Sequence, residues 1–317
     1  MADPLIEIKD LKKYFSYKKQ TLYAVDGASF KVFPQETLGL VGESGCGKTT
    51  LARTLMRLYE PTSGDIFFKG KSILKIKGKA IKNLRQDIQY IFQDPFASLN
   101  PRMTAGEIIA EPLRIYRIFN RPDREKRVQK LLQLVGLRSE YTQRFPHEFS
   151  GGQRQRIGIA RALALNPSFI ICDEPIAALD VSIQAQIVNL LNQLQREMGL
   201  TYLFISHDLS MVKYISNRVI VMYLGHFMEI ASSDDLYDNP FHPYTQGLLS
   251  AIPIPDPLIE KKRPRILLTG EIPSPVHPPK GCAFCTRCPM AKPECFEKRP
   301  LLREVSPGRQ VACHFVE

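Results

Sequence analysis

The chain has 317 residues, of which 44% are hydrophobic, and a formal net charge of +11. This length and apolar content are sufficient for one large folded domain or two ordinary ones. No stretch approaches the roughly 20 consecutive apolar residues of a membrane-spanning helix, so we expect no span. The N-terminal sequence lacks the regions of a signal peptide, which predicts a cytoplasmic location with reduced thiols. The positive charge is compatible with nucleotides, anionic lipids or nucleic acid as partners.

Apolar patterning predicts both strands and helices. Short apolar runs within residues 1–40 indicate a β-rich lobe. Residues 123–136 and 182–198 carry apolar residues at helical spacing. The unbroken runs 168–172 and 202–205 predict strands that are buried on both faces, as in a parallel sheet covered by helices. The chain is therefore predicted to be an α/β protein.

The composition changes towards the C-terminus. Residues 257–317 hold 10 of the 24 prolines, and 11 Lys or Arg against 6 Asp or Glu. Apolar periodicity fades in the same stretch. We therefore predict a domain boundary near residue 256, with domains at 1–256 and 257–317.

The stretch GESGCGKTT matches G-x-x-x-x-G-K-[ST] between an apolar run at 38–41 and a helix-forming run at 51–55. Glycines in this setting let backbone N–H groups point at a phosphate, and the following helix N-terminus favours an anion. Lys48 is expected to reach the β- and γ-phosphates of a nucleotide, and Thr49 to ligate Mg²⁺. The predicted nucleotide-binding residues are Gly42, Glu43, Ser44, Gly45, Cys46, Gly47, Lys48, Thr49 and Thr50.

Two further motifs complement this P-loop. Four apolar residues precede Asp173 and Glu174, which predicts that Asp173 holds Mg²⁺ and that Glu174 polarises an attacking water; a plain strand-end cap is the alternative. Ser150 to Gln153, the sequence SGGQ, precedes a helical run at 157–163 and forms a second anion cradle.

The order of these motifs resembles the ATP-binding cassette (ABC) ATPases over residues 1–250. The residues that carry the resemblance are the P-loop, Gln93, Ser150, Gly151, Gly152, Gln153, Asp173, Glu174, Asp180 and His207. The resemblance implies a P-loop NTPase fold with a RecA-like core, an antiparallel β lobe and a helical subdomain at about 96–160. Phe149 stands where the family usually has leucine, and we expect no loss of function because the position remains apolar.

The family resemblance also implies residue roles. Gln93 would contact Mg²⁺ or the attacking water, Asp180 would lie at a dimer seam, and His207 would sense the γ-phosphate. Tyr14 or Phe15 would stack on adenine, and spacing slightly favours Phe15. In these ATPases two subunits meet head to tail, so each ATP lies between the P-loop of one subunit and the SGGQ of the other.

Three stretches, 91–101, 241–249 and 257–317, resemble the F-type ATP-binding subunits of bacterial dipeptide and oligopeptide importers. This implies that the chain attaches peripherally to two permease subunits at the cytoplasmic face of the membrane. An extracytoplasmic peptide-binding protein would deliver the cargo to that permease. The second ATPase would be a paralogue or another copy of the chain, and the cargo a dipeptide, an oligopeptide or a nickel chelate. A DNA-repair ATPase is the alternative, but the chain has no zinc hook or long coiled coil, so we expect no nucleic acid partner.

Five cysteines lie in the C-terminal stretch: Cys282, Cys285, Cys288, Cys295 and Cys313. Reduced thiols disfavour disulfides, the two C-x-x-C pairs typical of zinc are absent, and the spacing only superficially suggests a ferredoxin. The resemblance to peptide importers implies a [4Fe–4S] cluster on Cys282, Cys288, Cys295 and Cys313, with Cys285 as an extra thiol. Zinc and unmetallated thiols are the alternatives, and nearby basic residues such as Arg287 and Arg299 could offset thiolate charge.

The two remaining cysteines have different expected settings. Cys46 precedes a helix N-terminus, where a thiolate is favoured. Cys172 precedes Asp173 on a buried strand and is expected to pack in the core.

Overall fold

The computed structural model describes residues 3–253 and 266–316, so the predicted boundary near residue 256 lies outside the described residues. The chain divides into two units. Unit 1 consists of Met1–Phe33, Thr37–Leu74 and Ser206–Glu317, and unit 2 of Pro34–Glu36 and Lys75–Ile205. No helix in the described ranges is both long and apolar enough to cross a membrane.

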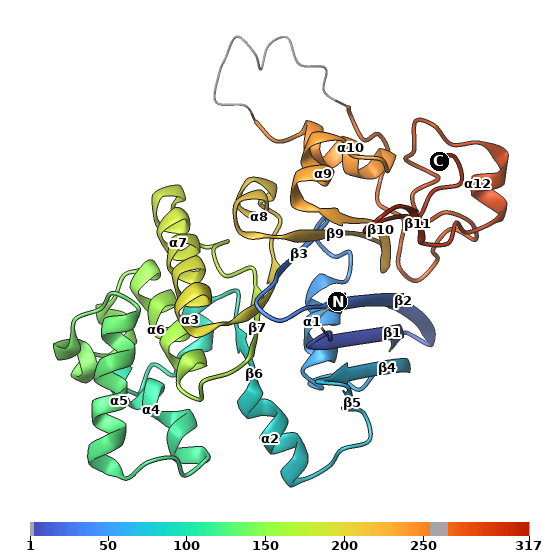
Figure 1. Ribbon diagram of the computed structural model, residues 1–317. Helices are drawn as coiled ribbons and strands as arrows, with labels where there is room; N and C mark the ends of the chain where they lie inside the picture. The colour runs from blue at the N-terminus through green and yellow to red at the C-terminus, as the bar shows by residue number, and fades with distance from the viewer. Residues whose placement is uncertain (1–2, 254–265, 317) are drawn as a thin grey trace. The chain divides into compact units, whose positions relative to one another are not determined.

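Unit 1 contains an antiparallel sheet in the strand order β2-β1-β4-β5 (Figure 1). Its strands are β1 (Ile6–Tyr17), β2 (Gln20–Val32), β4 (Ser63–Phe68) and β5 (Lys71–Ser72). Ile6 and Ile8 on β1 are buried, and so are Phe30 and Val32 on β2. This alternation places one face of the sheet in the core, and it confirms the predicted β lobe.

A second set of strands in unit 1 runs in the order β11-β12-β10-β9-β3. Their bounds are β3 (Thr37–Val41), β9 (Arg218–Tyr223), β10 (His226–Ser232), β11 (Arg303–Ser306) and β12 (Arg309–Val311). Strand β3 pairs with β9 in parallel, and the other neighbours are antiparallel. The helices of this unit are α1 (Lys48–Leu55), α8 (Leu209–Ile215), α9 (Ser233–Asp238), α10 (Pro243–Ser250) and α12 (Pro293–Glu297).

The C-terminal segment, residues 266–316, is integrated into unit 1. Val311 of β12 pairs with Glu229 of β10. The backbone N–H of Cys282 donates to the carbonyl of Cys295 at 2.7 Å, and a Cβ on Gly281 would lie 2.2 Å from the same oxygen. Glycine at this position therefore permits the close approach of two parts of the segment.

Unit 2 contains a parallel sheet formed by β6 (Ile88–Ile91), β7 (Phe169–Asp173) and β8 (Thr201–Ile205). All five residues of β7 and all five of β8 are buried, as predicted for strands covered on both faces. Two further helices are α2 (Lys79–Asp87) and α7 (Val181–Met198). The predicted helix at 182–198 is confirmed, and its apolar face is buried.

The remaining helices of unit 2 pack together (Figure 1). They are α3 (Pro95–Ser98), α4 (Ala105–Ile115), α5 (Arg121–Leu134), the short 3₁₀ helices η1 (Ser139–Gln143) and η2 (Pro146–Glu148), and α6 (Gly151–Leu163). Thr104 and Glu107 form a capping box at α4, and Asn120 caps α5. Such caps satisfy backbone N–H groups that a helix N-terminus leaves without partners.

Candidate functional site

The P-loop lies in unit 1 and connects β3 to α1. Gly42, Gly45 and Gly47 have φ values of 152°, 79° and 110°, which residues with a side chain rarely adopt. A Cβ on Gly47 would also lie 2.1 Å from the carbonyl oxygen of Ala24. Both backbone conformation and available space therefore require glycine here, and the predicted strand–loop–helix arrangement is present.

Lys48 begins α1, and only 5% of the residue is exposed. Its ammonium donates hydrogen bonds to the carbonyl of Gly42 at 2.8 Å and to that of Glu43 at 3.0 Å. Thr49 and Thr50 follow within the first turn of the helix. A buried cation, a helix N-terminus and a glycine-lined backbone together form an anion-binding site.

Two cysteines lie near the predicted nucleotide site. Burial raises the pKa of the Cys46 thiol, although the nearby ammonium of Lys48 acts in the opposite direction. The expectation of a favoured thiolate at Cys46 is therefore wrong, because loss of hydration outweighs the effect of the cation. Cys172 is fully buried on β7, and burial raises its pKa as well, which agrees with the predicted core position.

Asp173 and Glu174 lie in unit 2 at the end of β7. The Asp173 side chain is buried, and its carboxylate accepts a hydrogen bond of 2.5 Å from the hydroxyl of Tyr90. Tyr90 therefore fixes the orientation of a carboxylate that could ligate a cation. Sequence reasoning missed Tyr90, because nothing in the motif indicates which residue of a neighbouring strand supplies this bond.

Glu174 combines an unusual backbone with a side-chain partner. Its φ of 47° lies in the left-handed region, which is uncommon for residues with a Cβ and clusters at functional sites. The side-chain amide of Gln93 donates to its carboxylate at 2.8 Å. The structure thus brings together two residues that are 81 positions apart in sequence. Glu174 was predicted to polarise the attacking water, and Gln93 to contact Mg²⁺ or that water.

The predicted second anion cradle lies at the start of α6. Ser150 and Gln153 form a capping box, in which the Ser150 hydroxyl accepts from the Gln153 N–H at 3.3 Å and the Gln153 side chain accepts from the Ser150 N–H at 3.0 Å. A Cβ on Gly152 would lie 2.5 Å from Cγ2 of Ile183. Phe149 is buried and contacts Tyr141 edge to face. The phenylalanine that replaces the usual leucine therefore fills an apolar site.

Two more predicted residues lie at element ends. Asp180 is exposed and occupies the N-cap position of α7. His207 is exposed in unit 1, one residue before Asp208, whose side chain caps α8. The N–H of Asp208 donates to the hydroxyl of Ser206 at 3.0 Å, so both neighbours of His207 are held in place.

The two candidate adenine-stacking residues have different partners. The hydroxyl of Tyr14 donates to the Asp26 carboxylate at 2.7 Å, and its ring packs edge to face against Tyr23. The ring of Phe15 contacts Tyr59 edge to face at a centroid distance of 5.3 Å. Tyr14 is therefore tied into the β lobe by a polar bond that Phe15 cannot make.

All five C-terminal cysteines line one cavity of about 80 Å³ in unit 1. Its remaining lining includes Phe241, His242 and Phe284. Burial raises the pKa of Cys282 to about 12, and it also raises the pKa values of Cys285 and Cys288. Within residues 3–253 and 266–316, no three or more His, Cys, Asp or Glu side chains are placed to hold a single metal ion.

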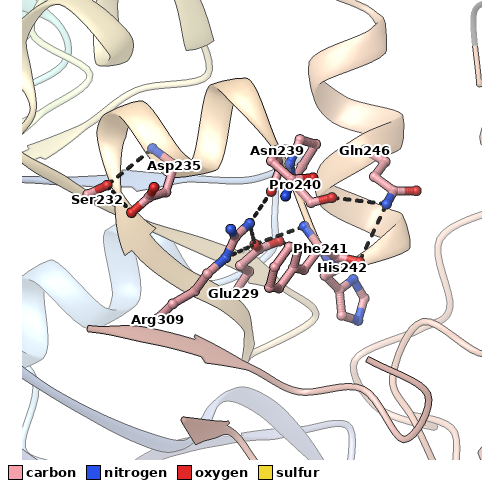
Figure 2. Close-up of polar contacts among 9 residues, drawn as sticks. All are labelled: Glu229, Ser232, Asp235, Asn239, Pro240, Phe241, His242, Gln246 and Arg309. Atoms are coloured by element: carbon pink, nitrogen blue, oxygen red, sulfur yellow. Dashed lines mark hydrogen bonds and ion pairs between the residues drawn. The ribbon is translucent and has the colours of Figure 1, made fainter. Parts of the chain in front are cut away.

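A buried ion pair explains part of the FHPYTQGLL stretch (Figure 2). The fully buried carboxylate of Glu229 accepts from the backbone N–H groups of Phe241 and His242 at 3.0 and 2.9 Å. Arg309 of β12 donates to the same carboxylate at 2.8 Å. His242 Nδ1 accepts from the Tyr244 N–H and caps α10. These contacts give the stretch a structural role.

The sequence is similar to known protein families and to individual relatives. The family described as "ABC transporter" matches residues 25–177, and the one described as "Oligopeptide/dipeptide transporter, C-terminal region" matches residues 228–295. YkfD of Bacillus subtilis (strain 168) is 61% identical over 98% of this chain and 95% of its own length. The oligopeptide transport ATP-binding protein OppF of Escherichia coli (strain K12) is 58% identical over 97% of this chain and 92% of its own. The chain belongs to the oligopeptide transport ATP-binding proteins of the ABC transporter family.

The fold is also similar to that of a solved ATP-binding cassette. The ATP-binding cassette MJ0796, in a dimeric post-hydrolysis state bound to ADP and Pi, superposes with a TM-score of 0.66 and 28% identity over 72% of this chain and 98% of its own. The predicted fold, an ABC nucleotide-binding domain with a peptide-transporter C-terminal region, is confirmed. As a member of the oligopeptide transport family, the chain is an ABC transporter ATPase.

Proposed function

We propose that this chain hydrolyses ATP at the cytoplasmic face of the membrane to power the import of dipeptides or oligopeptides through a permease. The observation that carries the proposal is the presence of two anion cradles and a carboxylate pair in a chain that is 58% identical to OppF of Escherichia coli along nearly its whole length. The name of that relative refers to oligopeptide transport. It supports a peptide as the cargo.

Nucleotide binding is assigned to the P-loop and to the residues that were predicted to hold Mg²⁺. In unit 1, Lys48 and the P-loop N–H groups would bind the phosphates, and Phe15 would stack on adenine. The glycine backbone leaves no room for a Cβ at Gly47, which supports a phosphate cradle. Thr49, Gln93 and Asp173 would hold Mg²⁺, since hydroxyl, amide and carboxylate oxygens are the donors that this ion prefers.

Hydrolysis is assigned to Glu174, assisted by Gln93 and His207. Glu174 would accept a proton from the attacking water, and its bond to Gln93 orients the carboxylate. His207 would contact the γ-phosphate. Bound Mg²⁺ supplies neutralisation of the phosphate charge. The rest of the catalysis consists of positioning by fixed protein groups.

We further propose a composite site shared by two subunits. Ser150, Gly151, Gly152 and Gln153 would complete the ATP site of a neighbouring subunit, with Asp180 at the seam. The dimeric state of the related cassette MJ0796 supports this arrangement. The partner would be a paralogous ATPase or a second copy of the chain.

The permease would dock on the helical part of unit 2, which corresponds to the predicted subdomain at about 96–160. Phe96, Ile115 and Phe119 expose 60%, 56% and 52% of their surfaces in this region. Exposed large apolar side chains such as these are candidates for contact with a partner. Two permease subunits and an extracytoplasmic peptide-binding protein would complete the importer.

A [4Fe–4S] cluster is proposed for a C-terminal domain at 257–317, with Cys282, Cys288, Cys295 and Cys313 as ligands. The chemistry of the donor set fits, because thiols line one cavity and thiolates are the usual ligands of such clusters. A bound cluster supplies positive iron charge that stabilises buried thiolates. Zinc is the alternative metal, although no three of the described thiols are placed around a single ion. Cys285 would be a free thiol.

The proposed function is tested by reconstituting the chain with its permease pair and second ATPase in proteoliposomes. We expect ATP-dependent uptake of labelled peptides, and no uptake when Lys48→Ala replaces the native chain. Uptake at the native rate with the Lys48→Ala chain would contradict the proposal. So would the absence of ATP-dependent uptake for every peptide tested with the native chain.

A further inference from the structure

An arginine of the cysteine segment forms an ion pair with the P-loop. Arg287 lies between Cys285 and Cys288 and donates from Nη1 to Oε2 of Glu43 at 2.7 Å and from Nη2 to Oε1 at 3.1 Å. The side chains of Arg287 and Glu43 are 6% and 24% exposed. A bidentate pair with this degree of burial is geometrically specific and is screened less than a surface pair.

The main chain of Glu43 is held by the same neighbourhood. Its backbone N–H donates to the hydroxyl of Tyr244 at 3.0 Å. The rings of Tyr244 and Tyr223 both pack against Phe284 of the cysteine segment, at centroid distances of 5.2 and 5.3 Å, and all three side chains are fully buried. Glu43 is therefore fixed at its side chain and its backbone by a rigid apolar cluster.

Glu43 in turn contacts the cation of the P-loop. Its carbonyl oxygen accepts from the ammonium of Lys48 at 3.0 Å and from the N–H of Cys46 at 3.3 Å. A shift of Glu43 would move an acceptor of Lys48 and bend the loop. An unpaired Glu43 carboxylate would also add negative charge beside the phosphates of the nucleotide, where like charges repel.

A second arginine of the segment makes a comparable link. Arg299 donates to the Asp26 carboxylate at 2.9 Å, and Tyr14 donates to the other oxygen of that carboxylate at 2.7 Å. The C-terminal segment thus contacts the β lobe as well as the P-loop through buried or half-buried ion pairs. Its contacts converge on the elements of unit 1 that are expected to hold the nucleotide.

We propose that Arg287 is a positioning residue for ATP binding, which holds the P-loop through Glu43 and cancels the charge of that carboxylate. The inference rests on the role of the P-loop in ATP binding. It makes the cysteine segment a structural part of the nucleotide site. Arg287 acts through Glu43, so its loss should change affinity for ATP more than the rate of the chemical step.

The test compares full-length Arg287→Gln, Arg287→Lys, Glu43→Gln and the double variant Arg287→Gln/Glu43→Gln. Binding of mant-ATP with Mg²⁺ and the KM and kcat for ATP are measured. We expect Arg287→Gln to raise Kd and KM about tenfold, within the usual range for coupled sites, while kcat changes less. Arg287→Lys should recover part of the loss, since it restores the charge but not the bidentate geometry. The double variant should bind no worse than Arg287→Gln, because the two changes remove one interaction.

Arg309→Gln is the matched control. Arg309 also belongs to the C-terminal segment and has a buried carboxylate partner, Glu229. Its loss is expected to lower the unfolding temperature and to loosen the stretch that carries Tyr244, while the Arg287–Glu43 ion pair remains. Native ATP affinity in Arg287→Gln, equal loss of affinity in Arg309→Gln, or additive effects in the double variant would each overturn the inference. Lys48→Ala separates the two claims: native ATP binding in that variant would instead refute the assigned P-loop function.

Discussion

The side-chain amide of Gln93 donates a hydrogen bond of 2.8 Å to the carboxylate of Glu174. This contact joins the loop after β6 to the residue after β7, and Glu174 has a left-handed backbone at that point. A residue held in this way presents its carboxylate in one orientation. It can then accept a proton without first rearranging.

The first prediction concerns Glu174→Gln. The amide keeps the size of the side chain but cannot accept the proton, so we expect native ATP affinity and a fall in kcat of at least about 100-fold. Steady-state phosphate release and equilibrium mant-ATP binding provide the measurement. Gln93→Ala is the companion variant, with a smaller expected loss of kcat. Near-native turnover in Glu174→Gln would remove Glu174 from the role of base.

The composite site predicts complementation between two inactive chains. Lys48→Ala lacks the P-loop cation, and Ser150→Arg places a bulky side chain in the other cradle. If ATP lies between the two motifs of different subunits, a mixture of the variants forms dimers with one intact site and regains part of the ATPase activity. Activity is measured across mixing ratios, with each variant alone as the control. A mixture no more active than its components, although both variants are folded, would argue against shared sites between copies of this chain.

Adenine stacking is tested by comparing Phe15→Ala with Tyr14→Phe. Loss of an aromatic face costs about 1–3 kcal/mol in base stacking, which corresponds to a rise in Kd for ATP of roughly 5- to 150-fold. Tyr14→Phe keeps the ring and loses only the hydrogen bond to Asp26, so we expect lower stability with native affinity. Isothermal titration and thermal unfolding distinguish the two effects. A larger loss of affinity in Tyr14→Ala than in Phe15→Ala would reverse the assignment.

The cysteines are tested one at a time by replacement with serine. We expect Cys285→Ser to retain iron, and serine at Cys282, Cys288, Cys295 or Cys313 to reduce it. Iron, acid-labile sulfide and zinc are measured after anaerobic purification, together with the visible absorption spectrum. Colourless protein with stoichiometric zinc would contradict the cluster. Loss of iron in Cys285→Ser would change its ligand set.

The protein is expected to become less stable as the pH falls, because of the titration of His226. Burial lowers the pKa of His226 to about 4, the charge of Arg299 acts in the same direction, and Asp26 opposes it. Since an unfolded histidine titrates near 6.5, the unfolded chain binds a proton between pH 6.5 and 4 that the folded chain does not. The free energy of unfolding should therefore decrease as the pH falls, by about 2 kcal/mol at pH 5 from this group. Urea unfolding of wild type and His226→Gln at pH 7.5, 6 and 5 measures this contribution. If the free energy of unfolding depends on pH in the same way in both proteins, His226 is not the source of the effect.

Much of unit 1 and unit 2 could be predicted because its signals are local. The P-loop glycines, the serine and glycines that precede the helical run at 157–163, and the apolar run before Asp173 each indicate a backbone shape within a few residues. Their structures follow the predictions closely. The left-handed backbone of Glu174 could not be predicted in this way, because it depends on contacts made by the neighbouring strands.

Other features depend on partners that are distant in sequence. Arg287 and Glu43 are separated by 244 positions, and no local pattern indicates which carboxylate a basic residue will meet. Strands β11 and β12 contain only four and three residues and were not predicted, because periodicity is weak over such lengths. Cys46 shows a third limit: a helix N-terminus favours a thiolate, but burial raises its pKa.

The pairing of β12 with β10 has a consequence for shortened forms of the protein. A chain that ended after α10 would expose the free edge of β10, a common starting point for aggregation. It would also leave the fully buried carboxylate of Glu229 without its guanidinium partner, which is strongly destabilising. A premature stop codon between the codons for α10 and β12 should therefore yield insoluble or rapidly degraded protein rather than a cassette that lacks only its cysteines.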